Sequence, residues 1–199
     1  MNRLIAFFVL LTALLSAQAQ DIQLLPPVKT GGKPFMEAVA ARHSERAYVK
    51  REMPQQMLSS LLWTANGFNR DGKRTVPTAR NKQEMSLYVV FENGAYFYDA
   101  HTHTLKLVTK GDVRDALGQP EVTNNAALSI VMVADQNKST IDYARIGTGY
   151  ISQNIYLFAA SEGMGTVARA LFKADELAKA LKLNDKQAII LVQPVGFLK

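Results

Sequence analysis

The sequence contains no cysteine, one tryptophan and three histidines in 199 residues. Without cysteine the chain has no disulfide, no thiolate nucleophile and no cysteine-ligated metal site, so its core must be stable unaided. The 23 Lys and Arg residues exceed the 17 Asp and Glu residues and give a formal net charge of +6, but they are scattered along the chain. Because there is no Lys/Arg run, the basic surface tolerates anionic ligands but does not indicate nucleic-acid binding.

Several catalytic signatures are also missing from the sequence. It has no strand–Gly-x-Gly-x-x-Gly–helix unit, no phosphate-loop motif, no Gly-x-Ser-x-Gly turn and no paired-histidine zinc motif. His101 and His103 would share one face of an extended segment, which is how two ligands of a metal site are often spaced. Because the sequence offers no third ligand, we interpret them as exposed histidines of a turn and predict no metal site.

The one long apolar run lies at the N-terminus. Arg3 precedes residues 4–15, which are apolar apart from Thr12, and Ala17-Gln18-Ala19 follows the run. The run is short for a membrane span, so the pattern predicts a secretory signal peptide, residues 1–19, that is cleaved after Ala19. An uncleaved membrane anchor is the alternative. We therefore expect an exported, periplasmic protein that is not inserted in a membrane after cleavage.

The rest of the sequence predicts one α+β domain, residues 34–199, preceded by an extended lead-in, residues 20–33. Pro26-Pro27 and Gly31-Gly32 oppose regular structure in the lead-in. Helices are predicted at 34–43, 54–66, 112–117, 142–162 and 173–183, and strands at 86–91, 95–98, 105–108, 128–134 and 188–195. This order favours a mostly antiparallel central sheet flanked by helices.

Two of the predicted elements are strongly apolar. Residues 128–134 are bounded by polar residues, which is typical of a strand buried on both faces. The helix at 142–162 is apolar almost all round, which indicates a central buried helix or an interface helix. Trp63 lies beside the buried stripe of the helix at 54–66, and we interpret it as a core or interface residue.

The segment Arg42-His43-Ser44-Glu45-Arg46 packs two guanidinium groups, an imidazole and a hydroxyl into five residues. Guanidinium groups and a short hydroxyl donor suit phosphate oxygens. The segment follows a predicted helix, and because a helix carboxyl end repels anions, the side chains themselves would have to bind a phosphate. The alternative is a solvated helix end in which Arg42 or Arg46 pairs with Glu37 or Glu45.

Four segments carry a recognisable combination of residues in a fixed order. Residues 42–46 fit an Arg-[Arg/His]-Ser-x-[Arg/Lys] motif, and residues 77–83 (PTARNKQ) fit a Pro-Ser-[Ser/Ala]-x-Asn-x-Gln loop. Residues 163–172 begin with a Gly-[Leu/Met]-Gly turn, and residues 195–197 end in Gly-Phe. Together these segments resemble the FMN-dependent nitroreductase family, and the resemblance covers the chain from about Lys33 onward.

One branch of that family is especially similar. Residues 61–67 and 74–79 resemble the branch that contains the azoline dehydrogenases of thiazole/oxazole-modified peptides. The resemblance implies the nitroreductase-like fold, in which two chains form an intertwined homodimer with two FMN sites at the subunit interface.

The resemblance also implies which residues hold FMN. One chain would bind the phosphate and the N1/O2 side of the flavin through Arg42, His43, Ser44 and Arg46. A cation at N1/O2 stabilises the reduced, anionic flavin and so favours its reduction. The further contacts implied are Pro77, Thr78 and Asn81 of the partner subunit, the peptide groups of Ala170 and Leu171 near flavin N5, and Lys199.

The sequence departs from the family pattern at the carboxyl side of the site. Many members have Glu-Gly or Gly-Gly where this chain has Ala170-Leu171, and many carry basic residues beyond the last strand, where this sequence has Lys199. Arg169 could point into the flavin cleft or out to solvent, and the sequence leaves both options open.

The resemblance implies an FMN-dependent oxidoreductase that passes hydride through flavin N5 to a small nitro, quinone or similar acceptor. NAD(P)H is the usual reductant of the family, but it is scarce outside the cytoplasm. Two alternatives therefore stay open: an FMN-dependent dehydrogenase of a peptide or small molecule that does not use NAD(P)H, and a non-catalytic flavin-binding protein. In a structural dimer without flavin, residues 42–46 would form surface salt bridges.

Overall fold

The fold is built around one antiparallel sheet. Its strands are β1 (Ile22–Gln23), β2 (Tyr48–Val49), β5 (Met85–Phe91), β6 (Gly94–Asp99), β7 (Thr104–Lys110), β8 (Leu128–Asp135), β9 (Met164–Thr166) and β10 (Gln187–Leu198). The strand order is β1-β7-β6-β5-β8-β10-β2, and β9 also pairs with β10. The computed structural model describes residues 20–199, so the predicted signal peptide, residues 1–19, lies outside the described residues.

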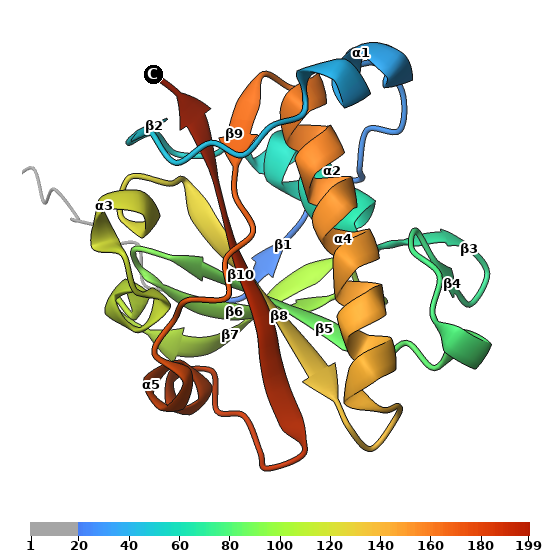
Figure 1. Ribbon diagram of the computed structural model, residues 1–199, viewed down its shortest axis with the longest axis vertical. Helices are drawn as coiled ribbons and strands as arrows, with labels where there is room; N and C mark the ends of the chain where they lie inside the picture. The colour runs from blue at the N-terminus through green and yellow to red at the C-terminus, as the bar shows by residue number, and fades with distance from the viewer. Residues whose placement is uncertain (1–19) are drawn as a thin grey trace, which may run out of the picture.

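Helices and a small hairpin surround this sheet (Figure 1). The helices are α1 (Phe35–Ala41), α2 (Gln55–Asn66), α3 (Pro120–Thr123), α4 (Ile141–Ser161) and α5 (Ala174–Ala180), with the 3₁₀ turns η1 (Ala79–Asn81) and η2 (Arg114–Leu117). The hairpin of β3 (Phe68–Arg70) and β4 (Lys73–Arg74) projects from the side of the molecule. The predicted α+β class, with a mostly antiparallel sheet flanked by helices, is confirmed.

Alternate residues of β8 face two separate cores, as a strand buried on both faces requires. Ile130 and Met132 pack in the core that contains α2 and α4. Val131 and Val133 pack in the second core, with Leu177 of α5. Because side chains alternate along a strand, the unbroken apolar run of β8 serves both cores.

The elements that sequence reasoning missed are short. β2 and β9 have two and three residues, and both pair with the last part of β10. A strand of this length has no readable periodicity, so it forms only because tertiary contacts bring it to a partner. The same pairing explains why β10 continues to Leu198, beyond the predicted end at residue 195.

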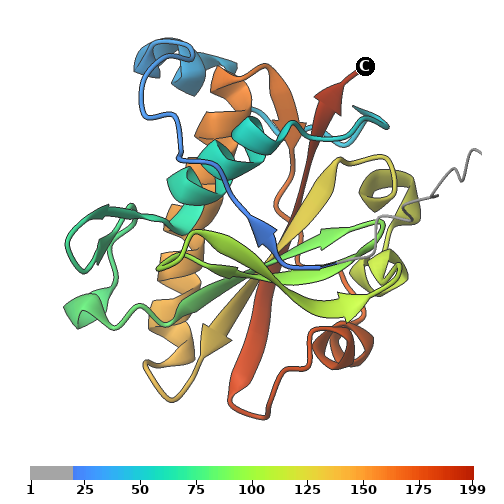
Figure 2. The same cartoon turned by 180° about the vertical axis from the view of Figure 1, so that it is seen from behind.

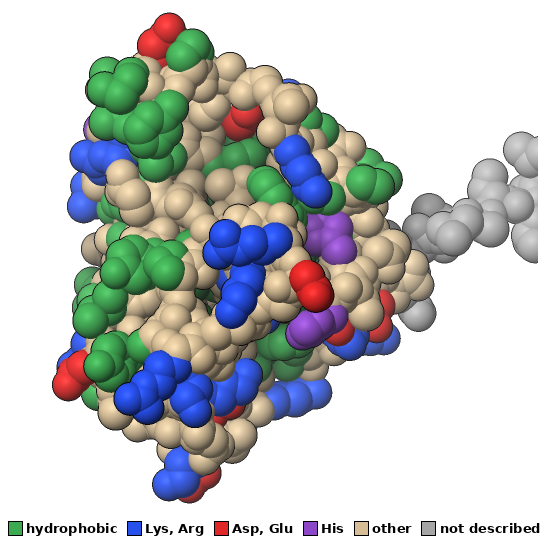
Figure 3. Space-filling model, turned by 90° about the vertical axis from the view of Figure 1, so that its right-hand side faces the viewer, with side chains coloured by type: hydrophobic (Ala, Val, Ile, Leu, Met, Phe, Trp, Pro, Cys, Tyr) green, Lys and Arg blue, Asp and Glu red, His purple; other side chains and the backbone are tan. Residues whose placement is uncertain are grey.

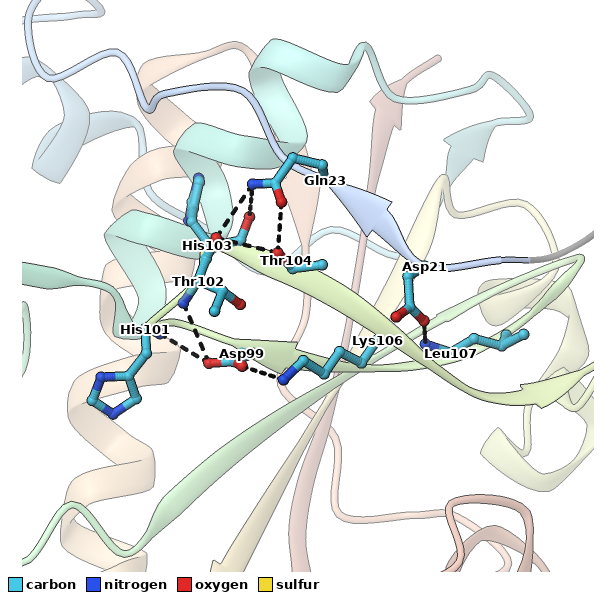
Figure 4. Close-up of polar contacts among 9 residues, drawn as sticks. All are labelled: Asp21, Gln23, Asp99, His101, Thr102, His103, Thr104, Lys106 and Leu107. Carbon is cyan, nitrogen blue, oxygen red and sulfur yellow. Dashed lines mark hydrogen bonds and ion pairs between the residues drawn. The ribbon is translucent and has the colours of Figure 1, made fainter.

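The lead-in, which we call the N-terminal strap (residues 20–33), begins as an edge strand of the sheet. Ile22 and Gln23 pair with Leu105 and Thr104 of β7, so the expectation of no regular structure is wrong for these two residues. The Asp21 carboxylate accepts a hydrogen bond from the Leu107 amide, at 2.7 Å. The Gln23 side chain accepts from the Thr104 hydroxyl at 3.0 Å (Figure 4).

Beyond β1 the N-terminal strap crosses α2 and reaches α4 (Figure 2). The Ser59 hydroxyl of α2 donates to the Leu25 carbonyl, and the Ser60 hydroxyl accepts from the Val28 amide at 3.0 Å. At its far end the Lys33 amide donates to the Ser161 hydroxyl at 2.9 Å. The strap is therefore tied to the body of the domain along its whole length.

The two neighbouring histidines have different surroundings, so the prediction of two exposed turn histidines is wrong for His103. Its Nε2 lies 2.8 Å from the Ser59 hydroxyl and its Nδ1 lies 3.0 Å from the Tyr98 hydroxyl. Burial lowers the pKa of His103, because it disfavours the charged imidazolium. His101 is exposed and its ring rests 4.6 Å from that of Phe68.

Within residues 20–199, the helices are all too short or too polar to traverse a lipid bilayer.

Trp63 is half-buried, and its indole N–H donates to the Phe68 carbonyl at 2.9 Å.

Candidate functional site

The segment that contains Arg42–Arg46 leaves the end of α1 and lies against α4. Arg42 is the residue that caps α1, and its guanidinium lies 5.1 Å from the centre of the Tyr156 ring. Cation–π contact of this kind holds an arginine in place without neutralising it. The Ser44 hydroxyl lies 2.9 Å from the Tyr156 hydroxyl, which also accepts a hydrogen bond from the Ala168 amide at 2.9 Å. One tyrosine hydroxyl thus joins the Arg42–Arg46 segment to the chain that follows β9.

Glycine makes this close approach possible. The Glu45 amide donates to the Thr166 carbonyl of β9 at 2.9 Å. A Cβ on Gly165 would lie 2.8 Å from Cγ of Glu45, a distance that real Cβ atoms do not show. Gly163, with φ of +68°, follows α4 in the left-handed region that favours glycine at the carboxyl end of a helix. The Gly-Met-Gly turn therefore has two roles: Gly163 ends a helix, and Gly165 leaves room for the Arg42–Arg46 segment to pack against β9.

The arginines of this segment do not pair with the acids proposed as their alternative partners. The Glu45 carboxylate accepts hydrogen bonds from the Arg46 and Ala47 amides, at 2.6 and 2.8 Å. These amides lower the pKa of Glu45 and keep it ionised. Within residues 20–199, neither Arg42 nor Arg46 has a carboxylate within 4.0 Å, and the ion pair formed by the segment is His43–Glu45 at 3.9 Å.

The carboxyl end of the chain meets the same corner of the molecule. Tyr48 and Val49 of β2 pair with Leu198 and Phe197 of β10. A Cβ on Gly196 would lie 2.8 Å from Cγ of Tyr48, so the closing glycine of the motif makes room for this ring. Lys199 follows directly after Leu198 and is exposed.

The segment that follows β9 runs beside β10 (Figure 1). Arg169 and Val192 exchange two backbone hydrogen bonds, each of 2.9 Å. Ala170 and Leu171 are exposed, and Leu171 keeps 64% of its surface accessible. The Arg169 side chain is buried beneath residues 117–119 and does not point to solvent, which removes one of its two predicted orientations.

The predicted loop at 77–83 lies on the other side of the molecule. The Asn81 and Gln83 side chains donate to the Gly72 carbonyl, at 3.1 and 2.9 Å, and so attach the loop to the β3–β4 hairpin. The Thr78 hydroxyl accepts from the Gln83 amide at 3.0 Å, and Pro77 is exposed. Figures 1 and 2 show this hairpin and β2 at opposite edges of the chain. A single chain therefore brings together three of the four motif segments and keeps residues 77–83 apart.

Known proteins resemble this chain over most of its length. The Nitroreductase family model matches residues 39–197. The chain belongs to the nitroreductase family. A Methanocaldococcus jannaschii protein assigned as a nitroreductase is 26% identical to it over 178 residues, which are 80% of this chain and 89% of that protein.

Solved structures resemble this member of the nitroreductase family over nearly its whole length. A crystal structure assigned as a nitroreductase of Ralstonia eutropha JMP134 has a TM-score of 0.83 at 29% identity, covering 93% of this chain and 92% of that one. A chain of the E. coli microcin synthetase McbBCD complex, solved with truncated pro-MccB17 bound, has a TM-score of 0.69 at 17% identity. That second likeness covers 99% of this chain and 85% of the other, and it shows the fold alone.

Sequence reasoning missed two tyrosines that build the site. Tyr156 is 9% exposed and Tyr48 is 2% exposed. Both rings look like core residues in the sequence. The available signal was chemical, because a buried tyrosine hydroxyl needs a hydrogen-bond partner. Tyr48 finds it in the Glu45 carbonyl and Tyr156 in Ser44 and Ala168.

Proposed function

We propose that this protein is an exported, homodimeric FMN-dependent oxidoreductase that acts on a small nitro, quinone or similar acceptor, with NAD(P)H as a candidate electron donor. The observation that carries the proposal is the corner where the Arg42–Arg46 segment, the Gly-Met-Gly turn and the end of β10 meet. The reaction class, that of an oxidoreductase, follows from the chain's membership of the nitroreductase family, whose model matches residues 39–197.

The donors at this corner fit a phosphate group. Arg42 and Arg46 lack carboxylate partners among residues 20–199, and the neighbouring Glu45 is held by backbone amides. We infer that Arg42, Ser44 and Arg46 bind the FMN phosphate and the N1/O2 side of the flavin, with His43 and Lys199 beside them. Ala170 and Leu171 are the exposed peptide groups proposed to lie near flavin N5.

The homodimer part of the proposal is supported by two features of the single chain. Large apolar side chains are exposed on two helices that pack together: Phe35, Met36 and Val39 on α1, and Tyr143, Ile146 and Tyr150 on α4. Figure 3 shows hydrophobic side chains gathered along this edge of the molecule. Exposed apolar surface of this kind is typical of a subunit interface. The second feature is the separate position of residues 77–83, which we propose to reach the FMN of the partner subunit.

When bound, FMN supplies the hydride chemistry at N5, and the residues of this chain bind it, orient it and shape the space above it. The chain offers no acid–base residue that we assign to the reaction. The export part of the proposal rests on the sequence of residues 1–19, and amino-terminal sequencing of the secreted protein tests it.

The test is an absorbance spectrum and an FMN titration of the purified protein, followed by anaerobic NADPH. We expect bound FMN that bleaches with NADPH. In Arg42→Ala and Arg46→Ala the dissociation constant of FMN should rise about 10- to 100-fold, the size of a charged hydrogen bond. Lys186→Ala, which removes one exposed cation elsewhere on the surface, is the matched control and should bind FMN as the wild type does.

Three results would count against parts of this proposal. Protein that takes up no FMN refutes the whole. FMN that binds but does not bleach with NADPH refutes the NAD(P)H link, and bleaching by a peptide or small-molecule substrate would then favour the dehydrogenase alternative. Unchanged FMN affinity in both arginine variants refutes the assignment of the phosphate site.

A further inference from the structure

Arg169 is one of the buried charged residues of the described chain. It is 6% exposed, and its side chain lies between the segment after β9 and residues 117–119, the turn that leads into α3. Its Nε donates to the Gln119 side-chain oxygen at 2.7 Å. Its Nη2 donates to the Gly118 carbonyl at 3.1 Å and to the Leu171 carbonyl at 3.0 Å. The guanidinium therefore links two loops through their backbone.

These contacts leave part of the guanidinium without a partner. Nη1 is buried and has no hydrogen-bond acceptor within residues 20–199, and no carboxylate lies within 4.0 Å of the side chain. Burial lowers the pKa of Arg169, because it disfavours the charged form, but an arginine stays protonated at neutral pH. Glu121 attracts this charge but forms no ion pair with it. A buried cation without a paired carboxylate is costly, and a neutral side chain could reach the same carbonyls with less cost.

The backbone around Arg169 is held in conformations that favour its contacts. Gly118 has φ of +66° and Gln119 has φ of +51°, and the latter is an uncommon value for a residue with a side chain. The Lys173 amide also donates to the Ala116 carbonyl at 3.0 Å, so the two loops are joined on both sides of Leu171. The exposed Ala170–Leu171 segment is thus held at both ends: the Arg169 backbone pairs with Val192, and the Leu171 carbonyl accepts a hydrogen bond from the Arg169 guanidinium.

We propose that Arg169 is a positioning residue for the flavin: it fixes the Ala170–Leu171 backbone against residues 117–119 and places a positive charge behind it that favours the anionic, reduced cofactor over the oxidised one. This inference rests on the proposed function, since it places Ala170 and Leu171 near FMN.

The test compares the dissociation constants of oxidised and reduced FMN for wild type, Arg169→Met and Arg169→Lys. In Arg169→Met the constant for reduced FMN should rise about tenfold more than that for oxidised FMN, equivalent to about 1.4 kcal/mol. Arg169→Lys keeps the charge, so its ratio of the two constants should stay within about threefold of wild type. Hydrogen–deuterium exchange of the FMN-free protein should quicken at residues 170–172 in both variants, because both lose the forked contacts.

Gln119→Leu is the matched control, because it removes the acceptor of Nε and leaves the charge in place. It should quicken exchange at residues 170–172 and leave the FMN ratio unchanged. If thermal unfolding shows that Arg169→Met does not fold, hydrogen exchange and the FMN ratio are measured on Gln119→Leu and Arg169→Lys alone.

An equal rise of both constants in Arg169→Met overturns the electrostatic role of Arg169, and so does a ratio in Arg169→Lys or Gln119→Leu that changes about tenfold. Unchanged hydrogen exchange in all three variants overturns the positioning role. If wild-type protein binds no FMN, the proposed function itself fails, and this inference falls with it. If wild type binds FMN and the variants match it, this inference alone fails.

Discussion

At the scale of single residues, the candidate site depends on side chains that look ordinary in the sequence. Tyr156 is an apolar position of a long helix, yet its hydroxyl contacts Ser44 and Ala168 and its ring supports Arg42. A helix residue of this kind lets the rigid α4 set the position of a loop. The arginine of the motif is thus held by an aromatic ring and kept clear of carboxylates.

Tyr156→Phe tests this arrangement, because it removes only the hydroxyl. The Ala168 amide then loses its acceptor, so the free energy of unfolding should fall by about 1–2 kcal/mol. The dissociation constant of FMN should rise several-fold, because Ser44 loses its orientation. Urea unfolding and FMN titration measure the two effects. Lys186→Ala, at an exposed turn, is the control and should change stability by less than about 0.5 kcal/mol.

At the scale of elements, the N-terminal strap is an integral part of the domain, although the family match begins only at residue 39. Leu24 is 4% exposed and belongs to the core that contains α2 and α4. The backbone of the strap is bonded to β7, α2 and α4 in turn. It therefore closes one edge of the sheet and covers part of the core.

Removal of the strap should destabilise the protein strongly. A chain that begins at Lys33 should lose about 3 kcal/mol or more of unfolding free energy relative to one that begins at Gln20, because it loses a buried leucine and several hydrogen bonds. If the short chain is insoluble, Leu24→Ala in the longer chain measures the same contact and should cost about 2–4 kcal/mol. Equal thermal unfolding midpoints for all three proteins would show that the strap is dispensable.

The main elements could be predicted from the sequence because each has a local signal. The apolar run at residues 128–134 predicts β8, and the apolar helical pattern at residues 142–162 predicts α4. β2, β9 and the strand in the strap have no such signal, since contacts with distant β10 and β7 create them. The burial of His103 has no local signal either, because its partners, Ser59 and Tyr98, come from other elements.

The candidate site was predictable only as separate motifs. Spacing placed the arginines after α1 and the glycines after α4, but not the contact between the two segments. That contact depends on the Tyr156 hydroxyl and on the space left at Gly165. Likewise, the burial of Arg169 follows from the path of residues 117–119, which no local pattern specifies.

At the scale of the whole molecule, the single chain exposes an apolar edge over α1 and α4. Phe35 and Met36 are 68% and 72% exposed, although they lie on the apolar face of α1. The sequence predicted α4 as a central or interface helix, and its exposed residues Tyr143, Ile146 and Tyr150 fit the second option. A second chain packed against α1 and α4 would remove these apolar side chains from water.

Ile146→Asp should therefore convert the proposed dimer to a monomer. A carboxylate within an apolar interface is costly to bury, so self-association should weaken by at least about 100-fold and FMN should be lost with it. Sedimentation velocity and the flavin spectrum measure the two changes, and circular dichroism should show an intact fold. Lys186→Asp, at an exposed turn, is the control and should stay dimeric. A dimeric Ile146→Asp protein would place the interface elsewhere.

The distance between residues 42–46 and residues 77–83 within one chain has a genetic consequence. Suppose that each site takes one segment from each subunit. A chain with a mutation in the first segment and a chain with a mutation in the second segment can then complement each other when they form a mixed dimer. Their mixed dimer contains one doubly damaged site and one intact site. Two inactive alleles expressed together should then restore part of the activity that neither restores alone, whereas two alleles damaged in the same segment should not.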